Sequence, residues 1–413
     1  MSSLRKAPSL CLVLLKFGVK RRREKTSQPQ HRAVCLNLAP RASALGRFRY
    51  LKQAINPASP ASAPTSVISE YVERYTEEPE DIAIPPSRFT GEKLRINSVT
   101  VKEVYACLKG LNSASGPDGM TAKSARTFSP GVWTTLFNRI LEKEIIPSQW
   151  RHIRARGIDK ENGKPDDDMG RWRPLFIANV GLRLLSAILA RRMTQWTSYH
   201  RVISEYQVGF FPVNGTTLNI FKARDRLHRK EIAVSIDLTD AFGSVHHSLL
   251  SSVIDDLTEG SFRSFLHNIS KPIINLGGSS KRIIRGCPQG SPLSPLLFNL
   301  CLDRAIRDAD IRANILGYAD DIISFGKNQE ECQERTDRLI LQLKNVSFEV
   351  NPSKCFSISA DYMSVDGSPI PRGTALVSKY LGIGIEPGVP MSSACATQFQ
   401  SALVDARRIP TPL

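Results

Sequence analysis

The sequence predicts an α/β fold, because segments with strand and helix patterns alternate along its central part. Residues 232–237 form a β-rich apolar run that ends in an acid, and residues 315–318 and 322–326 are apolar runs on either side of two adjacent acids. Pro295 is placed to open an apolar helix, and apolar residues recur on one helical face over residues 329–343. We expect the three strands to form one sheet, with the helix near residues 329–343 packed beneath it.

The paired acids Asp320 and Asp321 follow a pattern that suits a hairpin with both carboxylates at its tip. Two adjacent ionised carboxylates repel each other, and a divalent cation that neutralises them makes the arrangement easier to keep. Mg²⁺ prefers oxygen ligands and is usually held by one or two carboxylates together with substrate phosphates. Such pairs are also common without any metal, so a third carboxylate is needed to favour a metal site.

Asp237, at the end of the first strand, supplies that carboxylate if its strand lies beside the hairpin. Three converging carboxylates can hold two ions about 3.5–4 Å apart, the spacing used in phosphoryl transfer. The alternative is that Asp237 and Asp240 cap a helix that begins near Ser244. We favour the capping interpretation for Asp240 and reject it for Asp237.

Residues 286–300 lie between these elements and contain two glycines and three prolines before an apolar helix. This composition predicts a fixed loop that lets the backbone approach a ligand closely. The order of an acid-ended strand, a Pro-Gln-Gly-Ser-Pro loop and Tyr-Ala-Asp-Asp resembles reverse transcriptases of non-LTR retrotransposons, most of all the branch that inserts into ribosomal DNA genes. Further motifs that resemble the same family lie at residues 115–119, 146–150, 172–174, 207–210, 351–355 and 379–382.

The resemblance implies an α+β right-hand polymerase with fingers and palm at residues 97–385 and an antiparallel catalytic sheet. It implies an RNA-directed DNA polymerase, a nucleotidyltransferase that extends a DNA primer on an RNA template with deoxynucleoside triphosphates. Its cofactor would be two Mg²⁺ ions, with Mn²⁺ as a substitute. Gly243, where many relatives carry Asp, suits the ribosomal-DNA branch better than a splicing maturase.

The resemblance also assigns roles to single residues. Asp237, Asp320 and Asp321 would be the metal-binding catalytic acids, and Lys354 a catalytic proton donor to the leaving pyrophosphate. The residues that would bind the nucleotide are Phe242, Gln289, Gly290, Arg173, Lys160 and Leu238. Without the motifs, a Phe after an Ala is ordinary core, an Arg in this setting is a surface ion pair, and a Lys after Asn-Pro-Ser is a solvated loop charge.

Phe242 would act as a steric gate, because its ring would clash with a ribose 2′-hydroxyl and favour deoxynucleotides. Arg173 offers a rigid fork that matches phosphate oxygens, and Lys160 is a second cation for the triphosphate. Gln289 and Gly290 would border the nucleotide pocket, and the backbone oxygen of Leu238 would complete one metal's shell.

The 413-residue chain has 41% hydrophobic residues and a net charge of +17, which suits a large core and a polyanionic partner. Residues 1–53 carry 13 Lys or Arg and one acid, so residues 54–413 hold only +5. We predict that residues 1–55 form a disordered basic head. A nuclear address, an RNA-binding arm or a mitochondrial presequence are alternative interpretations of the same basic composition. Residues 56–96, rich in Ala, Ser and Pro and then acidic, indicate a linker.

The apolar stretch at residues 9–19 is too short to span a bilayer as a helix, so no membrane association is predicted. The eight cysteines include no Cys-x-x-Cys pair, which predicts reduced core cysteines rather than zinc fingers. Residues 386–413 resemble a truncated start of the thumb that follows the palm in this family. The alternative function is therefore an inactive remnant that binds nucleic acid through its basic head. The predicted locations are the nucleus, for target DNA, and the cytoplasm, for RNA assembly.

Overall fold

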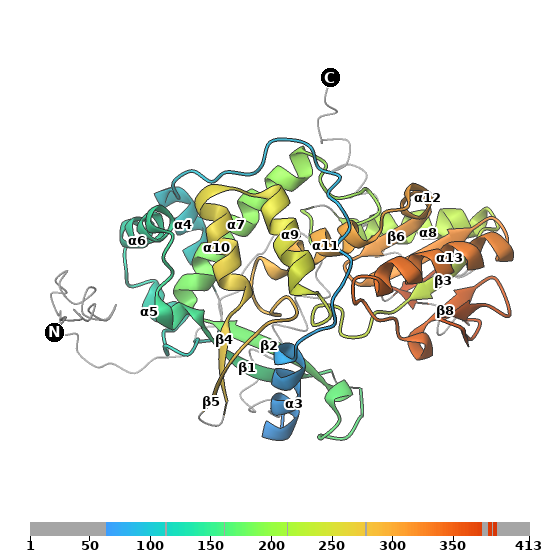
Figure 1. The fold of residues 1–413 in the computed structure, drawn as a ribbon, viewed down its shortest axis with the longest axis horizontal. Coiled ribbons are helices and arrows are strands. Elements are labelled where there is room, and N and C mark those ends of the chain that lie inside the picture. The colour runs from blue at the N-terminus through green and yellow to red at the C-terminus, as the bar shows by residue number, and fades with distance from the viewer. Residues whose placement is uncertain are drawn as a thin grey trace, which may run out of the picture. The chain divides into compact units, whose positions relative to one another are not determined.

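A four-stranded antiparallel sheet in the order β6-β7-β3-β8 carries the predicted acids (Figure 1). Its strands are Ile232–Ile236 (β3), Ile315–Tyr318 (β6), Asp321–Gly326 (β7) and Phe356–Ile358 (β8). The three strands predicted from the sequence are thus confirmed, and the computed structural model pairs them side by side. The structure describes residues 63–111, 114–160, 162–212, 214–276, 279–373, 379–381 and 383–385.

Two helices pack on this sheet because its apolar side chains need cover. Helix α8 (Gly215–His228) buries Ile220, Ala223 and Leu227 against apolar residues of all four strands. Helix α13 (Gln329–Lys344) packs against β3 and β7 and begins after Asn328, whose side chain accepts a hydrogen bond from the Glu331 amide. The buried residues of both helices recur with the period of an amphipathic helix. Helix α13 confirms the helix predicted at residues 329–343, and Asn328 caps its start.

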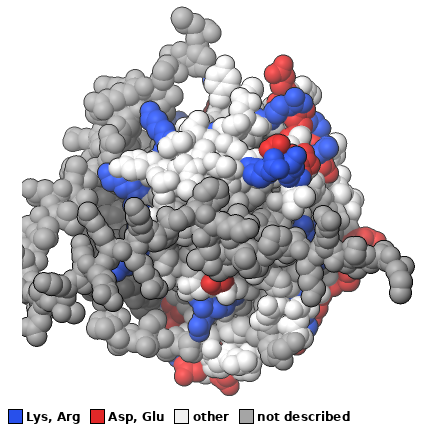
Figure 2. Space-filling model, turned by 90° about the vertical axis from the view of Figure 1, so that its left-hand side faces the viewer, with Lys and Arg blue, Asp and Glu red and all other residues white. Residues whose placement is uncertain are grey.

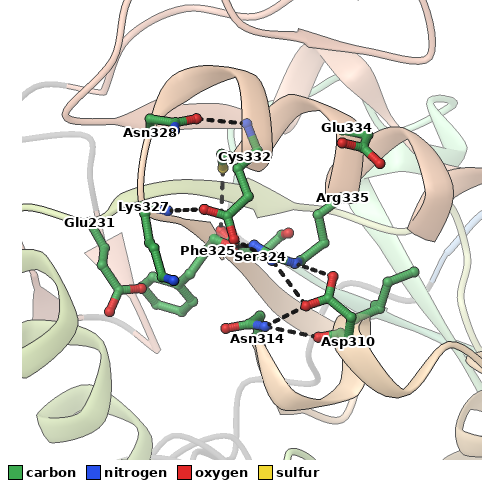
Figure 3. Close-up of polar contacts among 12 residues, drawn as sticks. Glu231, Asp310, Asn314, Ser324, Phe325, Lys327, Asn328, Cys332, Glu334 and Arg335 are labelled. Carbon is green, nitrogen blue, oxygen red and sulfur yellow. Dashed lines mark hydrogen bonds and ion pairs between the residues drawn. The ribbon is translucent and has the colours of Figure 1, made fainter.

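The polar middle of α13 is explained by one buried arginine. The side chain of Arg335 is 3% exposed and donates hydrogen bonds to Asp310 of α12 (Ala309–Ala313), at 3.0 Å, and to Glu331, at 2.8 Å (Figure 3). A third hydrogen bond goes to the backbone oxygen of Phe325 in β7. A buried guanidinium is costly unless its donors are satisfied, so this network ties α12, α13 and β7 together.

A second four-stranded sheet has the order β2-β1-β4-β5. Its strands are His152–Asp159 (β1), Trp172–Ala178 (β2), Ile273–Leu276 (β4) and Ser279–Arg282 (β5). β1 pairs antiparallel with β2 and parallel with β4, and the register sets Ile158 opposite Arg173. The remaining helices contact one another, and their bounds are Val101–Lys109 (α4), Ala122–Ala125 (α5), Pro130–Lys143 (α6), Val180–Tyr199 (α7), His247–Leu257 (α9), Gly260–Ser270 (α10) and Ser294–Ala305 (α11).

The helix predicted to open at Pro295 is confirmed, because that residue lies in the first turn of α11. The shorter elements are Ser148–Arg151 (η1), Met169–Arg171 (η2), Pro352–Lys354 (η3), Ser364–Val365 (β9), Ser368–Pro369 (β10), Lys379–Tyr380 (β11) and Ile383–Gly384 (β12). The predicted basic head and the predicted start of the thumb lie outside the described residues.

Part of the segment predicted as a linker is a packed helix instead. Helix α3 (Thr65–Thr76) buries Val67, Tyr71, Val72 and Tyr75, which recur at helical spacing. The Tyr71 hydroxyl donates to the backbone oxygens of Met169 and Trp172, which ties the helix to β2. The linker prediction was wrong here because it weighed composition and overlooked this apolar stripe.

The described cysteines, Cys107, Cys287, Cys301, Cys332 and Cys355, are free and buried, as predicted. In the part of the chain that the structure describes, no helix combines the length and hydrophobicity needed to cross a bilayer. On the face drawn in Figure 2, the coloured Lys and Arg side chains form small groups, several beside Asp or Glu, rather than one continuous basic surface. This fits the small net charge of residues 54–413.

Candidate active site

The acid pair lies on a tight hairpin between β6 and β7. Tyr318 pairs with Asp321, so Ala319 and Asp320 form a two-residue turn. Ala319 is 3% exposed and has a φ of 56°, in the left-handed region that a residue with a Cβ rarely adopts. The turn holds Asp320 at the tip, and Asp321 is the first residue of β7.

Asp237 directly follows β3, which lies beside β7. The register pairs Ile236 with Ile322, so it brings Asp237 level with Asp321. The Asp237 backbone oxygen accepts a hydrogen bond from the Asn351 amide at 2.8 Å, and Leu238 forms a bridge with Val350. These contacts fix the chain at the point where the carboxylate leaves the strand.

The three carboxylates interact electrostatically. Asp320 and Asp321 are accessible to solvent, but the protein packed around them makes their charged forms costly. This desolvation raises the pKa of both carboxyl groups, to about 7 for Asp321. The negative charge of Asp237 raises both pKa values further, and that of Asp320 adds to the rise at Asp321. The acids are therefore close enough to repel one another.

Three predicted cations lie in this part of the site. Lys354 pairs with Asp237 at 3.2 Å, and its charge and that of Arg173 lower the pKa of Asp320. Lys160 lies just after β1, and its ammonium donates to the Gly170 oxygen at 3.2 Å. Desolvation lowers the pKa of Lys160, as do the charges of Arg173 and Lys354, whereas Asp240 raises it. The structure thus brings Arg173 and Lys354 beside the acids, and Lys160 lies near these two cations and Asp240.

Arg173 is the cation best placed to receive a ligand. Its side chain is exposed on β2, and it forms no ion pair with any residue that the structure describes. Among these same residues, no set of three or more His, Cys, Asp or Glu side chains is arranged to hold a metal ion.

The glycine-rich loop lies against β2. The Phe176 amide donates to the Gln289 backbone oxygen at 2.6 Å, and Gly290 has a φ of 117°. A Cβ at Gly290 would lie 2.6 Å from the Phe176 oxygen, so only glycine fits this close approach. The loop is thereby fixed as predicted, and its Gln289 and Gly290 face the sheet that carries Arg173.

Phe242 belongs to an aromatic cluster at the catalytic hairpin. Its half-buried ring stacks on Phe298 at 4.5 Å and lies edge-on to Phe210 at 6.4 Å. Phe210 is 49% exposed, and its ring lies 6.2 Å from that of Tyr318. The ring at position 242 is therefore held by packing on one side and borders an accessible aromatic residue on the other.

Asp240 does not cap a helix, so that interpretation was wrong. Helix α9 begins at His247, three residues later than predicted, and the His246 side chain caps it by accepting from the Ser248 amide. Asp240 instead lies in a turn with a φ of 42° and pairs with Arg74 of α3 at 3.6 Å. Burial raises the pKa of its carboxyl, and the charge of Arg74 opposes that rise.

Sequence reasoning named the motif that contains Gln207 but gave this residue no role. In the structure its side chain forms hydrogen bonds with the backbone of Ala319 at the hairpin tip. The contact joins residues 112 positions apart, so no local pattern reveals it. The only available signal was the motif itself.

An antiparallel sheet with acids at a hairpin tip, beside cations and a glycine-rich loop, is the arrangement of a polymerase palm. Residues 158–385 match the family described as reverse transcriptase (RNA-dependent DNA polymerase). This match covers more than half of the chain, which therefore belongs to the reverse transcriptase family.

Curated relatives agree with this result. The chain is 28% identical to the retrovirus-related Pol polyprotein from type-2 retrotransposable element R2DM of Drosophila melanogaster, over 72% of this chain and 30% of that protein. It is 30% identical to the Pol polyprotein from type-1 retrotransposable element R2 of Nasonia vitripennis, over 64% and 27%. It is 27% identical to the probable RNA-directed DNA polymerase from transposon BS of D. melanogaster, over 71% and 36%. The chain thus spans about a third of the length of the relatives it matches.

Proposed function

We propose that this chain is an RNA-directed DNA polymerase that extends a DNA primer on an RNA template. The observation that carries the proposal is the group of three mutually repelling carboxylates, Asp237, Asp320 and Asp321, beside Arg173 and Lys354. Acids and cations in this arrangement suit a reaction between a hydroxyl group and a triphosphate. The family match and the retrotransposon relatives support the same reaction.

The donor set fits a divalent cation held jointly with substrate. The acids offer only oxygen ligands, and their mutual repulsion gives a cation a favourable place. Mg²⁺ is usually held by one or two carboxylates together with phosphate oxygens of the substrate. Asp237, Asp320 and Asp321 would hold two such ions, and the backbone oxygen of Leu238 would complete the shell of one of them. When bound, Mg²⁺ or Mn²⁺ lowers the pKa of the primer 3′-hydroxyl and neutralises phosphate charge.

The chain's own residues would orient the reactants. The primer 3′-hydroxyl loses its proton to water and its oxygen attacks the α-phosphorus of the nucleotide. A new P–O bond forms, and pyrophosphate leaves with the electrons of the broken bond. Arg173 presents a fork to the triphosphate oxygens, and Lys160 adds a second positive charge. For Lys354 to protonate the leaving pyrophosphate, its ammonium must separate from Asp237, which its 63% side-chain exposure permits.

Phe242 would face the sugar of the incoming nucleotide. Its stacking on Phe298 holds the ring in place, so a ribose 2′-hydroxyl could not displace it without loss of packing. Gln289 and Gly290 of the glycine-rich loop would border the same pocket. The nuclear and cytoplasmic locations stay predictions.

Primer extension tests the proposal. The full chain, an RNA template with a DNA primer, deoxynucleotides and Mg²⁺ should give extended product, and the double variant Asp320→Asn, Asp321→Asn should give none. Asp361→Asn is the matched control, because Asp361 is an exposed acid paired with Arg372 in a separate part of the palm. It should extend primers as the unmutated chain does. A folded chain that binds RNA but never extends a primer would instead favour the nucleic-acid-binding alternative.

A further inference from the structure

Gln207 clamps the tip of the catalytic hairpin through the backbone of Ala319. Its Nε2 donates to the Ala319 oxygen at 3.0 Å, and the Ala319 amide donates to its Oε1 at 2.8 Å. The Gly209 amide donates to the same Oε1 at 3.0 Å. Gln207 is 4% exposed, so water does not compete for these bonds.

The turn needs this support. Ala319 has the left-handed φ of 56°, which is unfavourable for a residue with a Cβ. Ala319 is also buried, and a buried backbone group without a hydrogen-bond partner is costly. The side-chain amide of Gln207 satisfies both backbone groups at once, so it stabilises a conformation that the turn would otherwise leave. That conformation sets the direction of the next residue, Asp320.

The clamp is itself held in place by its surroundings. The Val208 amide donates to the Gly317 oxygen at 3.1 Å, and Gln207 forms a parallel bridge with Gly317 of β6. Asn299 of α11 donates to the Gly209 oxygen at 2.8 Å. A Cβ at Gly209 would collide with the Ala319 nitrogen, so the segment can lie this close only with glycine there. The contacts with β6 and α11 thus fix the position of the backbone from which the Gln207 side chain extends.

We propose that Gln207 is a positioning residue for the polymerase reaction, acting through Ala319 to aim the Asp320 carboxylate at the metal and the nucleotide. It touches neither substrate nor cofactor. The inference rests on the proposed function for its link to catalysis. The geometric part, that Gln207 controls metal binding by Asp320, can be tested without polymerisation.

The chain offers a matched control for the loss of such a clamp. Gln333 of α13 makes the same pair of bonds, with Nε2 donating to the Ser364 oxygen at 3.0 Å and Oε1 accepting from the Ser364 amide at 2.9 Å. It supports the short strand β9 rather than the acids. Each glutamine also forms a third bond, from the Gly209 amide to Gln207 and from Gln333 to the Asp337 carboxylate. Replacement of either glutamine by methionine keeps the length of the side chain and removes all three bonds. If Gln207→Met lowers kcat and Mn²⁺ affinity and Gln333→Met does not, the effect comes from the contact of Gln207 with the hairpin tip rather than from the loss of such bonds in general.

The test measures primer extension and Mn²⁺ affinity for both variants. Loss of a residue that orients a ligand typically costs about 10–100-fold in metal affinity or activity. We expect Gln207→Met to lower kcat and to weaken Mn²⁺ binding, measured by electron paramagnetic resonance, each at least roughly tenfold. The Kd for the primer–template should stay within about twofold, because the clamp lies behind the acids. Gln333→Met should match the unmutated chain in all three measurements.

Gln207→Asn provides a second variant, which keeps the amide group but is one methylene shorter, so it cannot reach the Ala319 backbone in the same way. It should also lower kcat and weaken Mn²⁺ binding, and it keeps the test open if the methionine variant fails to fold. Unchanged kcat and Mn²⁺ affinity in a folded Gln207 variant overturn the proposal, and so do equal losses in Gln333→Met.

Mn²⁺ binding also separates this inference from the proposed function. If the chain binds Mn²⁺ in a way that Asp320→Asn abolishes but extends no primer, the proposed function fails and the comparison of Gln207→Met with Gln333→Met still decides the role of the clamp. If the unmutated chain shows no Mn²⁺ binding that Asp320→Asn removes, the inference is overturned.

Discussion

Mild acid should destabilise the protein through His247, a buried residue behind the glycine-rich loop. The residue is 6% exposed at the start of α9, and its Nε2 lies 3.0 Å from the Gly286 oxygen. Its Nδ1 is buried with no hydrogen-bond partner among the residues that the structure describes. Burial lowers the pKa of His247 to about 4, and the neighbouring charges of Lys271 and His246 act in the same direction. The folded protein therefore holds this imidazole neutral.

The sign of the effect follows from proton linkage. The folded-state pKa lies below the unfolded value of 6.5, so the unfolded chain binds the proton more readily. The contribution to stability is full above pH 6.5 and is lost as the pH falls toward 4. A shift of this size is worth about 3 kcal/mol when complete, and about 2 kcal/mol of it should disappear between pH 7 and pH 5.

Urea unfolding of the unmutated chain and of His247→Gln at pH 7 and pH 5 measures this effect. Glutamine keeps an amide donor for the Gly286 oxygen but takes up no proton, so the other titrating groups cancel in the difference. The unmutated chain should lose about 2 kcal/mol more than the variant between the two pH values. His267→Gln is the control, because His267 pairs with Asp255 at the surface. An equal loss in the unmutated chain and in His247→Gln would refute the reasoning.

Two further predictions concern the turn after Asp237. Phe242→Val should raise the relative kcat/KM for ribonucleotides over deoxynucleotides by roughly tenfold, and an unchanged ratio in primer extension would remove the gate role. Gly243→Ala should lower the unfolding free energy by about 1–3 kcal/mol in urea, because its Cβ would collide with the Asp240 carboxylate. Gly131→Ala, with its nearest contact at 3.8 Å in α6, should cost nothing, and equal losses in the two glycine variants would contradict this explanation.

The strands and the acids could be predicted from the sequence because their signals are local. The runs at 315–318 and 322–326 match β6 and β7 closely, since a short apolar segment bounded by acids or glycine has few other ways to be buried. Helix α13 was predicted despite a polar middle that weakened its pattern. The reason for that polarity, the buried Arg335 with partners on α12 and β7, depends on contacts that sequence spacing does not reveal.

The errors have equally physical causes. The segment 65–76 was assigned to a linker from its surroundings of Ala, Ser and Pro, although Val67, Tyr71 and Tyr75 recur every four residues and predict a buried helical face. Asp240 was interpreted as a helix cap because it precedes a helical pattern, but a tight turn with a φ of 42° separates it from α9. The first error overlooked a local pattern, and the second missed a turn that separates Asp240 from the helix.

Helix α3 lies outside residues 158–385, yet it takes part in building the site. Arg74 gives the buried Asp240 its ion pair, and the Tyr75 backbone oxygen accepts from the amides of Ile284 and Arg285, directly before the glycine-rich loop. Without α3 the Asp240 carboxylate would be buried without that cation, and these two amides would lose their acceptor. Because Asp240 follows Asp237 by three residues and Arg285 precedes Gln289 by four, both consequences fall on segments that present site residues. The family-matched region therefore depends on a helix upstream of it for the geometry of its own acids and loop.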